Sequence, residues 1–185
     1  DVETPDLAEL VEAVGDPISV FEVGTDLPAY LEANGTGLGL SDVAAAAASP
    51  DVGHALKLVL DGAVPEAVYR EALTKTRPRL IAVLREALAG VDALIFPTTP
   101  LPARPIGQDL EVDLNGRKVG TFQTFSRNSE PGANADMPGL SLPAGMTRSG
   151  LPVGIEIDGL HGNDSKLLAI GFALERILGS LPAPG

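Results

Sequence analysis

Apolar residues recur at helical spacing through most of the first ninety positions. The longest such stretch runs from Val64 to Gly90, and Pro78 is expected to kink it or divide it in two. Gly15-Asp16-Pro17 is expected to end the first helix, and the alternation over Ile18–Val23 predicts a short strand. The predicted helices are residues 4–14, residues 27–33, an Ala-rich stretch capped by Ser41-Asp42, a stretch from Ser49-Pro50 to Leu60, and residues 64–90.

Beyond residue 90 the pattern changes to short apolar runs that are typical of strands. The predicted strands are residues 91–96, 140–146 and 153–158, and residues 112–119 form a hairpin around Asn115-Gly116. Residues 97–105 are a proline-rich loop, residues 121–137 combine a short helix with a loop, and residues 166–178 form an amphipathic helix. The sequence therefore predicts an α/β fold with a mixed β-sheet flanked by helices. We expect a single domain over 1–185, with a mainly helical part at 1–90 and a sheet part at 91–185.

The charge and the composition of the chain argue against several classes of binding partner and of catalytic or metal site. The formal net charge of −12 argues against binding to nucleic acid or to an anionic membrane surface. The absence of cysteine excludes disulfides, thiolate metal sites and a cysteine nucleophile, and it fits a reducing compartment. We therefore expect a cytoplasmic protein.

The first ten residues, DVETPDLAEL, are acidic and have neither a basic n-region nor an apolar core, so they do not resemble a signal peptide. No apolar run approaches the roughly 20 residues that a membrane helix needs. Because the chain has no initiator methionine, we expect it to begin inside a longer gene product.

One candidate nucleophile lies in the run PGLSLPAGMTRSGLPVGIEIDG, residues 138–159. Gly139-Leu140-Ser141-Leu142-Pro143 differs by one residue from the G-x-S-x-G elbow that presents a catalytic serine. An elbow needs a sharp strand-to-helix turn, whereas here a strand, a turn and a second strand are predicted. Ser141 is therefore interpreted as a small strand residue, and a nucleophilic role is the alternative.

Other catalytic or ligand-binding patterns are weaker. His161 lies near Asp158 and Asp164, which suggests either a base with its orienting carboxylate or a solvated surface histidine. No serine is followed by lysine three residues later, and the histidine and carboxylate spacing matches no standard metal site. Gly35-Thr36-Gly37-Leu38-Gly39 lacks the lysine of a phosphate-binding loop and is interpreted as a connector.

Four segments, in this order, resemble the C-terminal part of amidase signature enzymes. They are VDALIFPTTPLPA (91–103), PGANADMPGLSLPAG (131–145), GLPVGIEIDG (150–159) and DSKLLAIGFALE (164–175). The variant SRNSEPGANADMPGLSLPAG (126–145) is similar to the indoleacetamide and mandelamide hydrolases of that family. The resemblance covers nearly the whole chain and is strongest from Val91 to Leu178.

The resemblance implies hydrolysis of carboxylic amides by a Ser–cis-Ser–Lys triad that lies in the N-terminal part of the family's sequence. This chain has no matching glycine- and serine-rich segment, so it is expected to contain no catalytic residue and to be inactive alone. Neither a metal nor an organic cofactor is implied. The resemblance instead suggests that residues of one loop contribute to a wall of the substrate pocket, namely Thr121, Phe122, Phe125, Asn128 and Asn134. The alternative is that Asn128 and Asn134 only satisfy the loop backbone.

Two functions remain open at this point. The first is the C-terminal portion of an amidase whose partners are the missing N-terminal portion and a small amide substrate. The second is a non-catalytic subunit or binding module that retains the pocket wall. The family also includes amidotransferase subunits that act on aminoacyl-tRNA, but the acidic charge gives no support to tRNA contact. A sheet without its neighbouring strands exposes edges that pair, so we also expect self-association.

Overall fold

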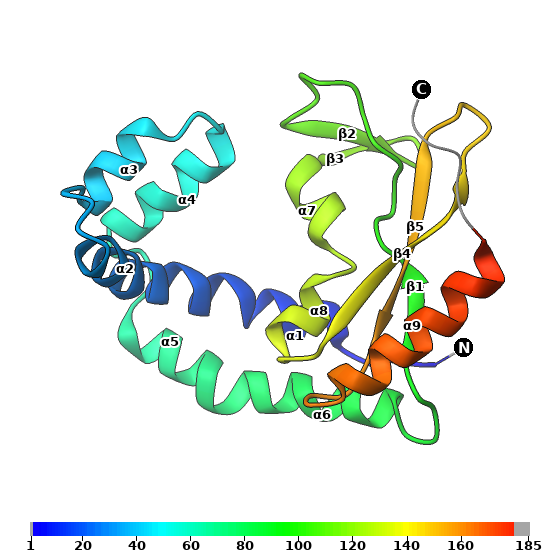
Figure 1. The fold of residues 1–185 in the computed structure, drawn as a ribbon. Coiled ribbons are helices and arrows are strands. Elements are labelled where there is room, and N and C mark those ends of the chain that lie inside the picture. Colours follow the sequence, from blue (N-terminus) through cyan, green and yellow to red (C-terminus); the bar gives the residue numbers. More distant parts are fainter. Residues whose placement is uncertain (1, 180–185) are drawn as a thin grey trace. The chain divides into compact units, whose positions relative to one another are not determined.

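The computed structural model describes residues 2–179 of the chain (Figure 1). These residues form two compact units, one comprising residues 8–80 and the other comprising residues 81–179 together with residues 2–7. Each unit is described by itself below.

The unit of residues 8–80 is helical. Its elements are α1 (Leu7–Glu12), α2 (Gly15–Ala33), α3 (Leu40–Ala46), α4 (Pro50–Leu60), α5 (Glu66–Glu71), the π-helix η1 (Ala72–Thr76) and the start of α6 (Arg77–Ala87). Its buried apolar residues are Leu10, Val11, Val14, Leu31, Leu56, Ala72 and Leu80. The predicted helices over residues 50–60 and 64–90 are confirmed within a few residues at their ends. The helix predicted over residues 27–33 is present and ends as expected, but it begins twelve residues earlier, at Gly15.

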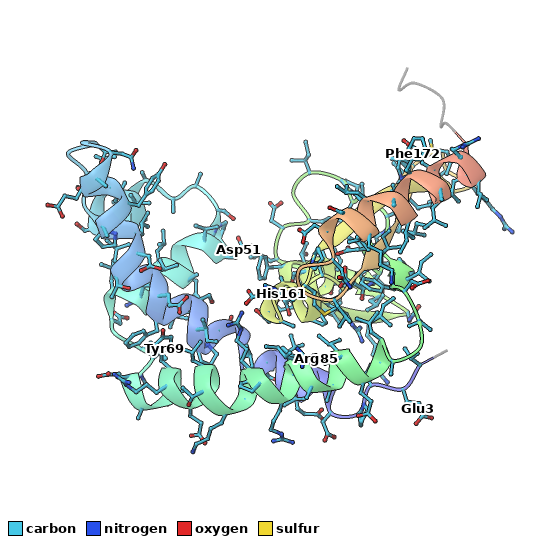
Figure 2. The ribbon with its side chains drawn as sticks, turned by 60° about the horizontal axis from the view of Figure 1, so that its bottom comes forward. Glu3, Asp51, Tyr69, Arg85, His161 and Phe172 are labelled. Carbon is cyan, nitrogen blue, oxygen red and sulfur yellow. The ribbon has the colours of Figure 1, made fainter. Side chains whose placement is uncertain are left out.

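The strand predicted over Ile18–Val23 is wrong, because these residues lie inside the long helix α2. Pro17 does not end a helix either; it lies in the first turn of α2, where its missing N–H has no intrahelical partner to lose. The helix is supported by a long-range contact. The ring of Phe21 stacks on Tyr69 with centroids 4.2 Å apart, and the Tyr69 hydroxyl (labelled in Figure 2) donates to Glu22 Oε1 at 2.9 Å.

Pro78 does not interrupt the helical path from Glu66 to Ala87. The five-residue π-helix η1 ends two residues before it. Proline removes one backbone donor and its ring crowds the carbonyl four residues earlier, here that of Thr74 within η1. The wider π-turn therefore accommodates the proline inside a continuous helical segment.

The other unit contains the sheets. Its elements are β1 (Leu94–Pro97), β2 (Glu111–Leu114), β3 (Arg117–Gly120), α7 (Thr121–Ser126), α8 (Glu130–Asn134), β4 (Gly139–Met146), β5 (Pro152–Asp158) and α9 (Asp164–Leu178). Strands β1, β5 and β4 form one sheet in that order, and β2 and β3 form a hairpin; the pairs of adjacent strands are antiparallel. Among the described residues, β1 is therefore an edge strand.

The three-stranded sheet has one apolar face and one polar face. Strand pairing places Leu140 opposite Ile157 and Leu142 opposite Ile155, and α9 packs on β4 and β5 (Figure 1). Gly171 of α9 approaches so closely that a β-carbon there would collide with Leu140. The opposite face carries Ser141 and Glu156 as one cross-strand pair and Gly139 and Asp158 as another. Below, this second side is called the polar face and is defined by Thr98, Ser141, Glu156 and Asp158.

Several local predictions in this unit are confirmed. Asn115 and Gly116 both have positive φ, 54° and 79°, as a type I′ turn requires. The helix over residues 166–178 and the strands over residues 140–146 and 153–158 are present. The predicted α/β class, with sheet and flanking helices, is also confirmed. Within residues 2–179 no helix combines the length and apolar character needed to span a bilayer.

Candidate functional site

The segment from Thr121 to Pro138, predicted to line a substrate pocket, consists of two short helices, α7 and α8. Backbone and side-chain hydrogen bonds attach it within its own unit. The backbone N–H of Thr121 donates to the carbonyl of Leu110, the Asn128 amide donates to the carbonyl of Pro97 at 2.7 Å, and the N–H of Gly159 donates to the carbonyl of Pro138. The segment is therefore held both by the hairpin and by the three-stranded sheet.

The first three predicted site residues share helix α7. Thr121 begins the helix, and its hydroxyl donates to the carbonyl of Gln108 at 2.9 Å. Phe122 is 57% exposed and Phe125 is half-buried. Because residues three apart lie on one side of a helix, Phe122 and Phe125 occupy the same side of α7. The structure thus places Phe122 and Phe125 on one side of α7, and the Thr121 hydroxyl fixes the start of the helix.

The two asparagines lie elsewhere on the segment. Asn128 follows α7, and its side-chain amide is engaged by the end of β1 through Pro97. Asn134 is the last residue of α8 and is half-buried. The Asn128 amide satisfies the backbone carbonyl of Pro97 at the end of β1, a role in backbone bonding that does not require a substrate. A pocket role for the five residues stays a prediction.

Ser141 lies in the middle of β4, on the polar face, and not at a strand-to-helix turn. Its Oγ forms a 2.6 Å hydrogen bond with Thr98 Oγ1, and its cross-strand neighbour is Glu156. Gly154 lies beneath this pair, since a β-carbon there would come within 2.8 Å of Thr98 Oγ1 and 3.0 Å of Ser141 Oγ. No hydrogen bond joins Ser141 to a histidine or lysine in the described part of the chain, so it lacks an activating base there.

His161, labelled in Figure 2, is not paired with the carboxylates next to it in sequence. Its Nδ1 lies 2.9 Å from the backbone carbonyl of Asp136 and is exposed. Asp158 lies in β5 and Asp164 begins α9, on either side of the loop. In residues 2–179, no group of three or more histidine, cysteine, aspartate or glutamate residues is arranged to hold a metal ion.

Asp158 is the residue whose environment the sequence did not reveal. It is 4% exposed, and its Oδ1 has no hydrogen-bond partner among the described residues. Burial, with a smaller contribution from the negative charge of Glu156, raises the pKa of Asp158 to about 7. Burial also raises the pKa of Glu156. The signal in the sequence was the alternation in Val153–Asp158, which places Glu156 and Asp158 on the same face of the strand.

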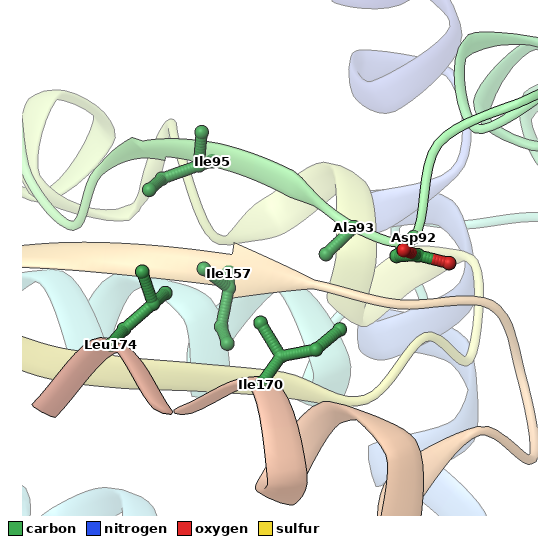
Figure 3. A pocket seen from close by; sticks show the side chains of 6 residues that line it. All are labelled: Asp92, Ala93, Ile95, Ile157, Ile170 and Leu174. Carbon is green, nitrogen blue, oxygen red and sulfur yellow. The ribbon is translucent and has the colours of Figure 1, made fainter. Parts of the chain in front are cut away.

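A shallow apolar pocket lies on the other face of the sheet (Figure 3). It has a volume of about 270 Å³ and is lined by Asp92, Ala93, Ile95, Ile157, Ile170 and Leu174. Asp92 forms a 2.7 Å ion pair with Lys166 of α9. None of the five predicted site residues lines this pocket, and its lining offers a single polar side chain with which to orient a substrate.

Comparison with known proteins identifies the family. The family profile described as Amidase matches residues 1–168. The chain is 43% identical over 181 residues to the indoleacetamide hydrolase of Agrobacterium vitis, covering 96% of this chain and 39% of that protein. It is 37% identical to the mandelamide hydrolase of Pseudomonas putida, covering 99% of this chain and 38% of that protein.

Solved structures agree with the sequence matches. A crystal structure of an amidase superposes with a TM-score of 0.76 at 33% identity, covering 96% of this chain and 37% of that one. The peptide amidase of Stenotrophomonas maltophilia has the same fold, with a TM-score of 0.64 at 23% identity. The chain thus spans about 39% of the length of the relatives that it matches. These findings confirm the predicted resemblance, and the chain belongs to the amidase family.

Proposed function

We propose that the protein to which this chain belongs hydrolyses carboxylic amides, with small aryl-bearing amides such as indoleacetamide or mandelamide as its substrate class. The observation that carries this proposal is the 43% identity to indoleacetamide hydrolase along 96% of the chain. In this proposal the chain is the C-terminal portion of the enzyme.

The proposed chemistry is acyl transfer through a serine outside this chain, in a Ser–cis-Ser–Lys triad. The serine oxygen adds to the amide carbonyl, the C–N bond breaks, and ammonia or an amine leaves with a proton from the triad. Water then attacks the acyl-enzyme ester and releases the acid. Ser141 does not compete as the nucleophile, because it is bonded to Thr98 and has no basic partner in the described part of the chain.

The proposed role of this chain is to bind and orient the substrate. Phe122 and Phe125 present aromatic side chains on one side of α7, and such surfaces suit an aryl group. Asn128 and Thr121 fix the segment through bonds to Pro97 and Gln108. A pocket wall built in this way affects substrate affinity more than the rate of bond cleavage.

A hybrid enzyme tests this function directly. In the hybrid, this chain replaces the matching 181-residue segment of the Agrobacterium vitis indoleacetamide hydrolase. We expect the hybrid to release ammonia from indoleacetamide, whereas the purified 185-residue chain alone releases none. A folded hybrid without turnover on either aryl amide, or turnover by the chain alone that survives stringent purification, would contradict the proposal.

The alternative is a non-catalytic subunit or binding module that keeps the pocket wall. The observation in its favour is that, within residues 2–179, the Ser141 hydroxyl is bonded to Thr98 and the His161 ring to the Asp136 carbonyl, so neither is joined to a catalytic partner. The coding sequence upstream of Asp1 distinguishes the amidase from the binding module. A lysine followed by a glycine- and serine-rich segment supports the amidase, and an upstream region without them supports the module.

A further inference from the structure

The polar face of the sheet carries two carboxylates that reach the same point. Glu156 and Asp158 are two residues apart on β5 and therefore project to the same side. A β-carbon on Gly139 would lie 2.8 Å from Asp158 Oδ1 and 3.2 Å from Glu156 Oε1, so both groups converge above Gly139. Two negative charges this close repel each other unless a proton or a cation lies between them.

Two glycines lie against the carboxylate of Asp158, the buried residue of the pair. A β-carbon on Gly132 of α8 would collide with Asp158 Oδ2, and one on Gly139 of β4 would crowd Oδ1. The two glycines thus leave the space that the Asp158 carboxylate occupies. Glu156 is only half-buried, so the pair is closed at Asp158 and open at Glu156.

The described residues supply no positive charge to this pair. The cross-strand neighbours of Asp158 are Leu94 and Gly139, and those of Glu156 are Phe96 and Ser141. The charged group that acts on Asp158 is Glu156, which is also negative. Oδ1 of Asp158 has no donor at all among these residues. A buried carboxylate in this position is costly unless it is protonated or paired with a donor.

We propose that Glu156 and Asp158 together bind one basic side chain, an ammonium or guanidinium group, from the part of the amidase that lies outside this chain. The inference rests on the proposed function in one respect: it requires that this chain acts within a longer amidase. About 61% of the length of the indoleacetamide hydrolase lies outside the match, since this chain covers 39% of it. The net charge of −12 favours a basic partner segment by complementarity.

A basic side chain fits the geometry better than a free cation does. A guanidinium group presents several N–H donors in a fixed plane and can bond two carboxylates at once. The site is enclosed at Asp158 and approachable at Glu156, as suits a long side chain entering from one direction. Such a contact positions the strand β5 and the adjoining helix α8 and takes no part in bond cleavage.

The first experiment measures the carboxyl titration of Asp158 in the complete 185-residue chain by carbon-13 NMR, with Asp158→Asn to assign the resonance. Methylguanidinium chloride is the probe, and tetramethylammonium chloride at equal ionic strength is the control because it has charge but no N–H donor. We expect methylguanidinium to lower the pKa of Asp158 by about one unit or more and the control to leave it unchanged. Equal shifts with both salts, or none with either, would overturn the proposal.

The second experiment identifies the source of the cation in the hybrid enzyme. There we expect Asp158 to be ionised well below neutral pH without any probe, and methylguanidinium to have no further effect. If the pKa stays near 7 and the probe still lowers it, the site binds a free cation and the side-chain proposal is wrong. If it stays near 7 and no probe moves it, the carboxyl carries a proton, which also overturns the proposal.

Stability of the hybrid provides a readout that does not depend on turnover. Asp158→Asn and Glu156→Gln should each lower its thermal midpoint, whereas Asp109→Asn, at an exposed position, should not. An active hybrid in which neither substitution lowers the midpoint sinks this inference and leaves the proposed function standing. A folded hybrid that has no activity but in which the pKa of Asp158 is lowered would support this inference and contradict the proposed function.

Discussion

Asp158 should destabilise the chain when the chain is alone, and replacing it should reveal by how much. An aspartate has a pKa of 3.8 in the unfolded chain and about 7 in the folded one. Because the folded state holds the proton of Asp158 more tightly, the contribution of Asp158 to the free energy of unfolding is largest below pH 3.8. That contribution is lost as the pH rises toward 7, and it stays lost above it.

The magnitude follows from the size of the shift. Each pKa unit corresponds to about 1.4 kcal/mol, so a shift of about three units makes the ionised carboxylate cost at most about 4 kcal/mol near pH 8. Asp158→Asn removes this charge but buries an amide that also lacks partners, at a cost of about 1–3 kcal/mol. We therefore expect Asp158→Asn to raise the free energy of unfolding by about 2 kcal/mol near pH 8.

The assay is urea unfolding of the 185-residue chain and its variants, followed by circular dichroism. Since the sequence pI is about 4.4, the measurements are made above that value to keep the chain soluble. Between about pH 5.5 and 8, the stability advantage of Asp158→Asn over the unmodified chain should grow by about 2 kcal/mol. Glu156→Gln should reduce this growth by removing the neighbouring charge, and Asp109→Asn should leave it unchanged.

Two outcomes would refute the reasoning. One is an advantage of Asp158→Asn that is the same at both pH values, because the carboxyl would then not titrate in this range. The other is a loss of stability near pH 8, because Asp158 would then have a favourable partner within the chain.

The remaining predictions concern packing, the hairpin turn, the pocket segment and association. Ile157→Ala should cost about 2–5 kcal/mol in urea unfolding because Ile157 is 1% exposed, whereas Ile95→Ala at 60% exposure should cost little; similar losses would contradict the assigned burial. Gly116→Ala should cost about 1 kcal/mol because φ is 79°, and a neutral result would argue against the type I′ turn. In the hybrid, Phe122→Ala should raise KM with little change in kcat, whereas Asn128→Ala should lower the thermal midpoint; an unchanged KM for Phe122→Ala would remove it from the pocket. Light scattering of the isolated chain should show self-association through the edge strand β1, and a monodisperse monomer at high concentration would count against it.

Local sequence was enough to predict the elements whose structure is decided locally. The hairpin depends on Asn115-Gly116, because both residues must adopt positive φ and these residue types do so at low cost. The helix α9 and the strands β4 and β5 carry strong periodic patterns bounded by turn residues. In these cases each local preference agrees with the final fold.

The error at Ile18–Val23 shows where local reasoning stops. Six residues with alternating character fit a strand as well as a helix, and a proline such as Pro17 is typical of a helix boundary. The helix is supported by the stacking of Phe21 on Tyr69 and by the bond from Tyr69 to Glu22, 47 residues apart in sequence. A contact of that range has no signature in a local window.

The environment of Asp158 was hidden for a related reason. Asp158 and His161 are only three residues apart in the sequence, which suggests that the carboxylate orients the histidine ring. The register of β5 against β1 and β4 turns Asp158 toward Gly132 and Gly139, and His161 contacts the Asp136 carbonyl. Alternation along β5 predicts that Glu156 and Asp158 share a face, but which face is covered depends on α8 and α9, which pack on opposite sides of the sheet.

The buried carboxylate of Asp158 and the exposed side chain of Ile95 are both unfavourable in the isolated chain, and a longer polypeptide that covers them would make both favourable. The unpartnered carboxylate of Asp158 costs stability, and the exposed Ile95 on the edge strand β1 presents apolar surface to water. They lie on opposite faces of the same sheet, so one small ligand cannot relieve both. A longer polypeptide can, by pairing with β1 while placing a basic side chain against Glu156 and Asp158. If that is their origin, the hybrid enzyme should reverse the sign of the Asp158→Asn effect, from stabilising in the isolated chain to destabilising in the hybrid. A change of sign of that kind cannot arise from a carboxyl that is merely protonated in both contexts.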